Sequence, residues 1–143
     1  CLLALTAAAT APPPSEEWPR LGGRDGSGVS SETGLPVEFG PERNLVFKAA
    51  LPGRGHSSPI VWGDRLFLTT AVKLGPEPGH VPVEHTIDGQ VFLHPDSTDG
   101  DHRHEYRVLA LDAATGDILW DTLAIETVPY DNRHAAGSYA SPT

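Results

Sequence analysis

The chain has 143 residues and a formal net charge of -9 at pH 7, from 10 Lys and Arg against 19 Asp and Glu. Proteins neutralise nucleic-acid phosphates with clustered Lys and Arg, and this sequence has no such cluster, which argues against a nucleic-acid partner. The 14 prolines and 15 glycines indicate many turns. No apolar run reaches the ~20 residues that a transmembrane helix needs.

The first residues have the pattern of a secretory signal whose basic start is missing. Residues 1–11 are apolar and then rich in small side chains, and cleavage after Ala9 or Ala11 would fit. We therefore interpret them as a signal-peptide remnant and residues 12–17 as a proline-rich linker. The protein is expected in the periplasm or outside the cell. Cys1 leaves a second possibility, a lipoprotein acylated at that residue.

The next part of the chain predicts a turn-rich segment followed by a hairpin. Residues 18–48 hold few apolar anchors among many turn residues and are expected to wrap the fold. The run 44–50 is a candidate edge strand. Two strand-like runs follow, 58–62 and 65–72, and the Gly-Asp pair at 63–64 between them favours a primed hairpin turn.

An insertion from about 74 to 105 holds five of the seven histidines and many carboxylates. It contains a predicted small hairpin, 84–94, turned by the Asp-Gly pair at 88–89. His102 and His104 alternate along a strand, so both imidazoles would lie on one face, which makes them weak candidates for metal ligands. The spacing matches no zinc or calcium motif, which favours a solvated loop instead.

Beyond the insertion, the runs 106–112 and 117–124 predict a second hairpin. Four residues of this hairpin stand at fixed spacing, namely Ala110, Asp112, Gly116 and Trp120. The pattern Ala-x-Asp-x-x-x-Gly-x-x-x-Trp resembles the tryptophan-docking repeat of the pyrroloquinoline-quinone (PQQ)-like β-propellers. The resemblance implies that the indole packs near the glycine and on a small residue of a neighbouring repeat. These four residues are therefore expected to be structural, with the aspartate accepting hydrogen bonds from the turn.

Further segments are similar to the opening of a secreted subgroup of this family. They are Trp18-Pro19-Arg20, the glycine-rich run 22–28, Gly34-Leu35-Pro36 and the run 51–59. With them, the resemblance covers residues 18–143. It implies an all-β fold, a β-propeller of four-stranded antiparallel blades, of which this chain holds the N-terminal segment and about one blade.

A short internal repeat supports the blade interpretation. Residues 56–60 align with 139–143, sharing the Ser-Pro pair at 58–59 and at 141–142. Blade repeats usually run to ~40–50 residues, so the insertion accounts for the larger offset here. One blade leaves two faces unburied, and we expect the sequence to be a fragment whose other blades lie outside it.

In a propeller, the connections that lead to the innermost strands lie at one rim of the central channel, together with the loop between the second and third strands. The candidate binding residues on these connections are Arg54, His56, Arg133, His134 and Tyr139. Arginine suits carboxylates through its bidentate fork, and histidine exchanges protons near neutrality. The alternative is that these side chains only satisfy carbonyls of the turns.

The resemblance leaves different function classes open. The favoured hypothesis is an exported, non-catalytic propeller that binds a protein, a small molecule or a glycan at the channel rim. The alternative is a quinoprotein dehydrogenase that oxidises alcohols or sugars with PQQ and calcium. No acidic base, calcium-ligand set or vicinal cysteine pair of such enzymes matches here, so its catalytic residues would lie beyond this sequence. A metal-binding role of the insertion is a third possibility.

Overall fold

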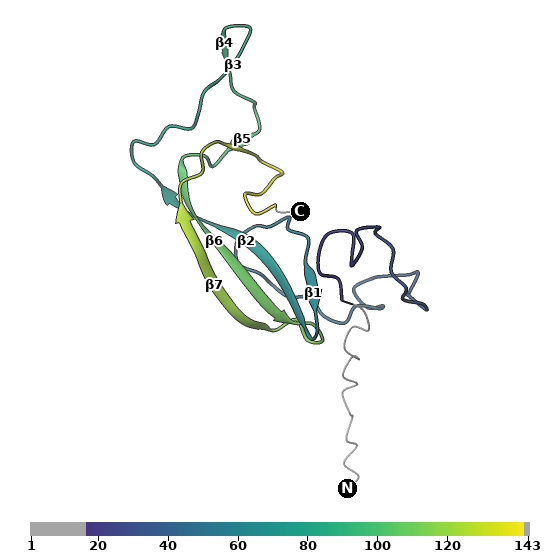
Figure 1. Ribbon diagram of the computed structural model, residues 1–143. Coiled ribbons are helices and arrows are strands. Elements are labelled where there is room, and N and C mark those ends of the chain that lie inside the picture. The colour runs from purple at the N-terminus through teal and green to yellow at the C-terminus, as the bar shows by residue number, and fades with distance from the viewer. Residues whose placement is uncertain (1–16, 142–143) are drawn as a thin grey trace.

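The computed structural model describes residues 17–141, and this part of the chain is all-β. Its described residues form eight strands in three antiparallel sheets and no helix, hence no helix able to cross a membrane (Figure 1). The interpretations of residues 1–11 and of nearly all of the linker fall outside the described residues. So do the last two residues of the internal repeat.

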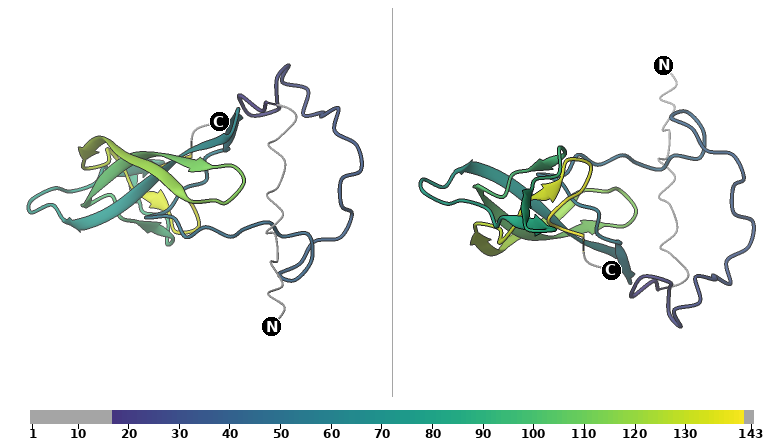
Figure 2. Two further views of the ribbon diagram at one scale, coloured as in Figure 1. Left: turned by 90° about the horizontal axis from the view of Figure 1, so that it is seen from below. Right: turned by 90° about the horizontal axis from the view of Figure 1, so that it is seen from above.

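The main sheet is formed by four strands, β1 (Ile60–Trp62), β2 (Arg65–Pro76), β6 (His102–Asp112) and β7 (Ile118–Thr127). They lie in the order β1-β2-β6-β7, and every neighbouring pair is antiparallel. The prediction of four antiparallel strands, made from four apolar and alternating runs, is confirmed. The long β2, β6 and β7 twist together as one curved layer (Figures 1 and 2).

The central strands are longer than expected and extend into both ends of the predicted insertion. The β2–β6 register continues from Lys73 opposite His104 to Pro76 opposite His102, with an irregularity between the two pairs. A proline offers no N–H to a ladder, so its place at the strand end is where a sheet tolerates it. The true connection between the central strands is therefore residues 77–101.

Within this connection, the predicted small hairpin is present as β3 (His85–Ile87) and β4 (Gln90–Phe92). Its turn residues Asp88 and Gly89 have φ values of 52° and 77°, as a type I′ turn requires. The hairpin projects away from the main sheet (Figure 1). Its strands are exposed to solvent along their whole length.

A third, two-stranded sheet ties the insertion to the chain that follows β7. Its strands are β5 (Ser97–Thr98) and β8 (Arg133–His134). Figure 1 shows β5 and the C-terminal segment lying together at the end of the main sheet from which the hairpin rises. This sheet positions the candidate site described below.

The hydrophobic core is small. Among the described residues, the buried apolar side chains are Ala71, Leu109, Ala110, Leu111 and Ala140. Strand β7 is exposed over nearly all its length, although it carries large apolar side chains. The sheet therefore leaves apolar surface uncovered on its β7 side.

The segment before β1 wraps the sheet only loosely. It is joined to the sheet by a bridge between Trp18 and Val61, and from there it forms a wide arc beside the sheet (Figure 2). The candidate edge strand at 44–50 is not a strand in the structure. Its Phe47 side chain instead packs over the β6–β7 turn at Gly116, so this part of the chain makes a side-chain contact rather than a ladder.

Candidate functional site

A cavity of about 280 Å³ lies where the central strands meet the loop before β1 and the segment after β7. Its charged and polar lining is Arg54, Lys73, Asp99, His104, Arg133, Ser138 and Tyr139. The cavity thus gathers three cationic side chains around one carboxylate. Ligand sites are usually concave and mostly apolar, with a few convergent polar groups that fix the ligand, and the charged side chains here are such a set.

The carboxylate of Asp99 is the centre of the cluster. Its side chain is 7% exposed, and Oδ1 accepts hydrogen bonds from Lys73 Nζ at 2.7 Å and from Thr98 Oγ1 at 3.0 Å. Oδ2 accepts a hydrogen bond from Arg133 Nη2. Burial opposes ionisation, but the donors outweigh it, and the pKa of Asp99 falls from 3.8 to about 2. Asp99 is therefore a fixed anion at neutral pH.

Arg133 organises the loop that follows it. Its side chain is 12% exposed, and Nη1 donates to the carbonyls of His134 and Ala135 at 3.0 Å and of Gly137 at 3.1 Å. With Nη2 bound to Asp99, most of the donors of this guanidinium are engaged inside the protein. Arg133 therefore stabilises the wall of the cavity through these contacts.

Arg54 and Lys73 are the cations that keep donors for a ligand. The Lys73 side chain is 46% exposed and donates one ammonium hydrogen to Asp99, which leaves two ammonium hydrogens for a ligand. Arg54 is exposed, and its Nη1 donates to the Ala135 carbonyl at 3.2 Å. Both side chains face the cavity with unused N–H groups.

A glycine lets the chain bring Arg54 to this position. Gly53 has a φ of +70°, and a Cβ there would lie 2.4 Å from the carbonyl oxygen of Ala71. The next residue then forms a bridge to β2, with Arg54 and Ala71 exchanging two backbone hydrogen bonds of 2.9 Å. Any side chain at position 53 would push the loop, and with it Arg54, away from the strand.

Tyr139 and His104 form the inner wall. The Tyr139 hydroxyl donates to the Asp131 carbonyl at 2.8 Å, and its ring meets the His104 ring edge-on at a centroid distance of 4.8 Å. Burial raises the pKa of Tyr139 to about 12 and lowers the pKa of His104 below 6.5. Both side chains are neutral at pH 7, and His104 donates from Nδ1 to the His102 carbonyl at 2.8 Å.

Of the five rim candidates predicted from sequence, the structure gathers Arg54, Arg133 and Tyr139 at this cavity. His56 is outside the lining, and its backbone N–H donates to the Ala140 carbonyl at 2.8 Å. His134, next to Arg133 on β8, faces away from the cavity toward the insertion, because successive side chains of a strand alternate.

Sequence reasoning did not place Lys73 or Asp99 in this cluster, although Asp99 is one of the insertion aspartates that offer oxygen ligands to a metal. Lys73 ends an otherwise apolar strand run, and Asp99 is one of several aspartates in a polar insertion. The Asp-Gly pair at 99–100 was a usable signal, since Asp99 has a φ of 68° and Asp-Gly pairs are common at such turns.

The two weak metal candidates are engaged separately. His102 Nδ1 lies 2.7 Å from Asp101 Oδ1, and His104 is buried against Tyr139. Among the described residues, neither belongs to a group of three potential metal ligands. Lone hydrogen-bonded histidines on a sheet face are the simpler account of both.

The tryptophan-docking residues lie at the other end of the main sheet. Asp112 Oδ1 accepts hydrogen bonds from the backbone N–H groups of Ala114 at 2.8 Å and Thr115 at 2.9 Å, and these bonds lower the pKa of Asp112. Trp120 lies opposite Ala110 in the β6–β7 register, and its ring centroid is 6.0 Å from that of Phe67.

Within this chain the indole therefore packs on β2. The Phe47 side chain packs directly on Gly116, and its Cδ2 would lie 2.3 Å from a Cβ at position 116. The Trp120 residue keeps 38% of its surface exposed.

A second cavity, of about 320 Å³, lies between the N-terminal segment and the main sheet and is mostly apolar. Its lining includes Leu21, Ile60 and Phe67, with Arg20 as its charged member.

No family model matches the chain, and no curated protein or solved structure shows significant similarity to it. What the chain binds is therefore inferred from the chemistry of its own residues, and the cavity around Asp99 offers the more specific set.

Proposed function

We propose that the chain is part of an exported PQQ-like β-propeller repeat protein that acts as a binding scaffold. Its ligand site is the cavity around Asp99, and the ligand presents an anionic group, such as a carboxylate of a protein, a glycan or a small molecule. The observation that carries the proposal is the convergence of Arg54 and Lys73, both with unused donors, on a cavity built by the buried Arg133–Asp99 pair.

The electrostatics favour an anion at this point of a strongly acidic protein. Asp99 is the one carboxylate among the lining residues, against three cationic side chains, although the chain as a whole carries -9. A local field of opposite sign concentrates an anionic ligand and orients its approach. The guanidinium of Arg54 can hold a carboxylate in a bidentate pair, and the Lys73 ammonium adds a point charge.

The antiparallel order of the main sheet supports the propeller proposal, because a blade is a four-stranded antiparallel sheet. Hydrogen bonds also join the two segments that lie at the two copies of the internal repeat. His56 N–H donates to the Ala140 carbonyl, and Ser138 Oγ donates to the Arg54 carbonyl at 2.9 Å. Innermost strands of successive blades are neighbours around a channel in the same way. The exposed apolar side chains of β7 would suit the face of another blade.

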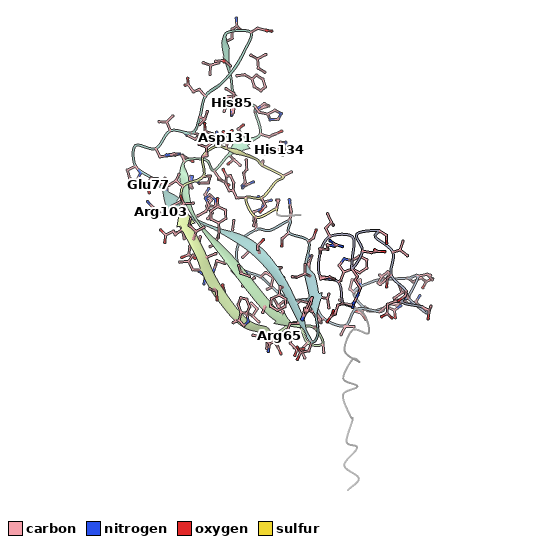
Figure 3. All side chains as sticks on the ribbon, in the orientation of Figure 1. Arg65, Glu77, His85, Arg103, Asp131 and His134 are labelled. Carbon is pink, nitrogen blue, oxygen red and sulfur yellow. The ribbon has the colours of Figure 1, made fainter. Side chains whose placement is uncertain are left out.

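The proposal is tested by calorimetric titration with glucuronate and with poly-glutamate, as monomeric and polymeric carboxylate probes. We expect saturable binding that weakens at least about tenfold, about 1.4 kcal/mol, in Lys73→Met and in Arg54→Leu. Arg65→Leu is the matched control, because Arg65 is a half-exposed arginine at the opposite end of the sheet (Figure 3). Its variant should bind like the unmodified chain.

Equal binding by all three variants, or no binding of either probe, would refute the anion site. A parallel titration with PQQ and calcium, followed by dye reduction with a panel of alcohols and sugars, distinguishes the alternative function. Saturable cofactor binding with turnover would support the quinoprotein dehydrogenase in place of a non-catalytic scaffold.

A further inference from the structure

His94, Asp96 and His134 form a compact group on the side of β8 opposite the cavity. One potential ligand atom from each residue lies within 4.8 Å of the other two, and all three side chains are exposed. His134 Nε2 is 3.4 Å from Asp96 Oδ2, and His94 Nδ1 is 4.0 Å from the same oxygen. The two imidazole centroids are 5.5 Å apart.

These separations are close to those of a tetrahedral metal site. Zinc binds histidine nitrogen and carboxylate oxygen at ~2.0–2.2 Å, which places neighbouring tetrahedral ligands about 3.3–3.5 Å apart. The His134–Asp96 pair already has this spacing. His94 Nδ1, at 4.0 Å from Asp96 Oδ2, must move closer to reach it, and an exposed side chain can do so.

The backbone fixes the group across two distant parts of the sequence. Ala135 N–H donates to the Asp96 carbonyl at 2.8 Å, and Ser97 pairs with His134 in the β5–β8 sheet. A turn with Ser97 N–H donating to the His94 carbonyl at 2.9 Å brings the third ligand close. Ligands placed by backbone hydrogen bonds need little further ordering when a metal binds.

We propose that His94, Asp96 and His134 bind a zinc ion. Two imidazoles and one carboxylate suit zinc rather than calcium or magnesium, which prefer oxygen ligands. Three protein ligands leave a fourth position for water. The ion links the insertion to the segment after β7. It therefore stabilises the cavity wall formed by Arg133, but it is not itself part of the anion site.

Zinc must displace existing hydrogen bonds of both rings. His94 Nδ1 accepts from the Asp96 N–H at 3.2 Å, and His134 Nδ1 accepts from the Ala136 N–H at 3.1 Å. When zinc takes Nε2 of His134, the ring proton moves to Nδ1 and the Ala136 bond is lost. Both bonds lie at the long end of the usual range for N–H donors, and the metal–nitrogen bonds replace them.

The test uses the full-length exported protein without a histidine tag and with Cys1→Ser, because a free thiol also binds these metals. Cobalt(II) replaces zinc as the visible probe. We expect intense tetrahedral absorption bands that saturate at one equivalent and disappear when zinc is added. In His134→Gln the affinity should fall at least about tenfold, and zinc should no longer raise the melting temperature.

His56→Gln is the control, since it also removes one histidine but lies outside the group. Its cobalt spectrum and zinc-dependent melting shift should match those of the Cys1→Ser chain. Absence of saturable tetrahedral bands, or equal affinity in His134→Gln and His56→Gln, would overturn the site. Either result leaves carboxylate binding at Arg54 and Lys73 unaffected, so the two proposals fail independently.

Discussion

Replacing Asp99 by asparagine removes the anion at the centre of the cavity while keeping the side-chain shape. The pKa of Asp99 is about 2 in the folded protein against 3.8 ordinarily, a difference of about two units. Each unit corresponds to about 1.4 kcal/mol, so the ionised carboxylate contributes about 2.5 kcal/mol to folding at pH 7. Removing a partner of a buried ion pair often costs 3–5 kcal/mol. The lower figure applies here because Arg133 keeps three carbonyl acceptors and Lys73 is half exposed.

Urea denaturation at two pH values measures this contribution. Because the folded-state pKa is depressed, the stabilisation is present above pH 3.8 and is lost as the pH falls from 3.8 through about 2. The Asp99→Asn chain should be about 2.5 kcal/mol less stable at pH 7, and this gap should narrow by about 1 kcal/mol at pH 3. Asp88→Asn is the matched control, since it is exposed and has a similar φ of 52°. A gap below 0.5 kcal/mol at pH 7, or one that does not narrow in acid, would refute the account of the cluster.

Three further predictions concern other parts of the fold. Because burial lowers the pKa of His104, stability should be full above pH 6.5 and fall as the pH drops below it, a dependence that His104→Asn removes in urea denaturation. Gly53→Ala should destabilise by more than about 1 kcal/mol in thermal melts, whereas Gly79→Ala, with a φ of +78° but no neighbour within 4 Å, should lose less. A double-mutant cycle on Arg43 and Glu38 should give a coupling below about 1 kcal/mol, because both side chains are about two-thirds exposed. A coupling free energy above about 1 kcal/mol between Arg43 and Glu38 would contradict the third prediction. An equal loss of stability in Gly53→Ala and Gly79→Ala would contradict the second, and an unchanged pH dependence in His104→Asn would contradict the first.

The strands could be predicted from sequence because their signals are local. Alternation and β-branched or aromatic content identify 65–72 and 106–112, and the Asp-Gly pair at 88–89 identifies the small hairpin. The strand ends were less accurate. The β2–β6 ladder continues through the polar residues near Lys73 and His104, where pairing with a long partner outweighs composition.

The site was predicted only in part because its members come from four distant segments. The expected propeller topology brings the loop before β1 and the segment after β7 to one rim, which is why Arg54, Arg133 and Tyr139 could be named together, and all three line the cavity. Lys73 and Asp99 join them only through strand register and a positive φ, which no short pattern in the sequence specifies. The side chain that packs on Gly116 could not be predicted from the neighbouring sequence either, because it is Phe47, which belongs to the loosely attached N-terminal segment.

The central claim is that an anionic ligand binds between Arg54 and Lys73, and side-chain NMR tests it most directly. The protein is labelled with ¹⁵N and titrated with glucuronate while the Lys73 ammonium, the Arg54 guanidinium and the Arg65 guanidinium are followed. The account predicts saturable shifts at Lys73 and Arg54, with Arg65 unchanged at the far end of the sheet (Figure 3). Shifts at the apolar cavity near Phe67, or equal small shifts at all three cations, would contradict it.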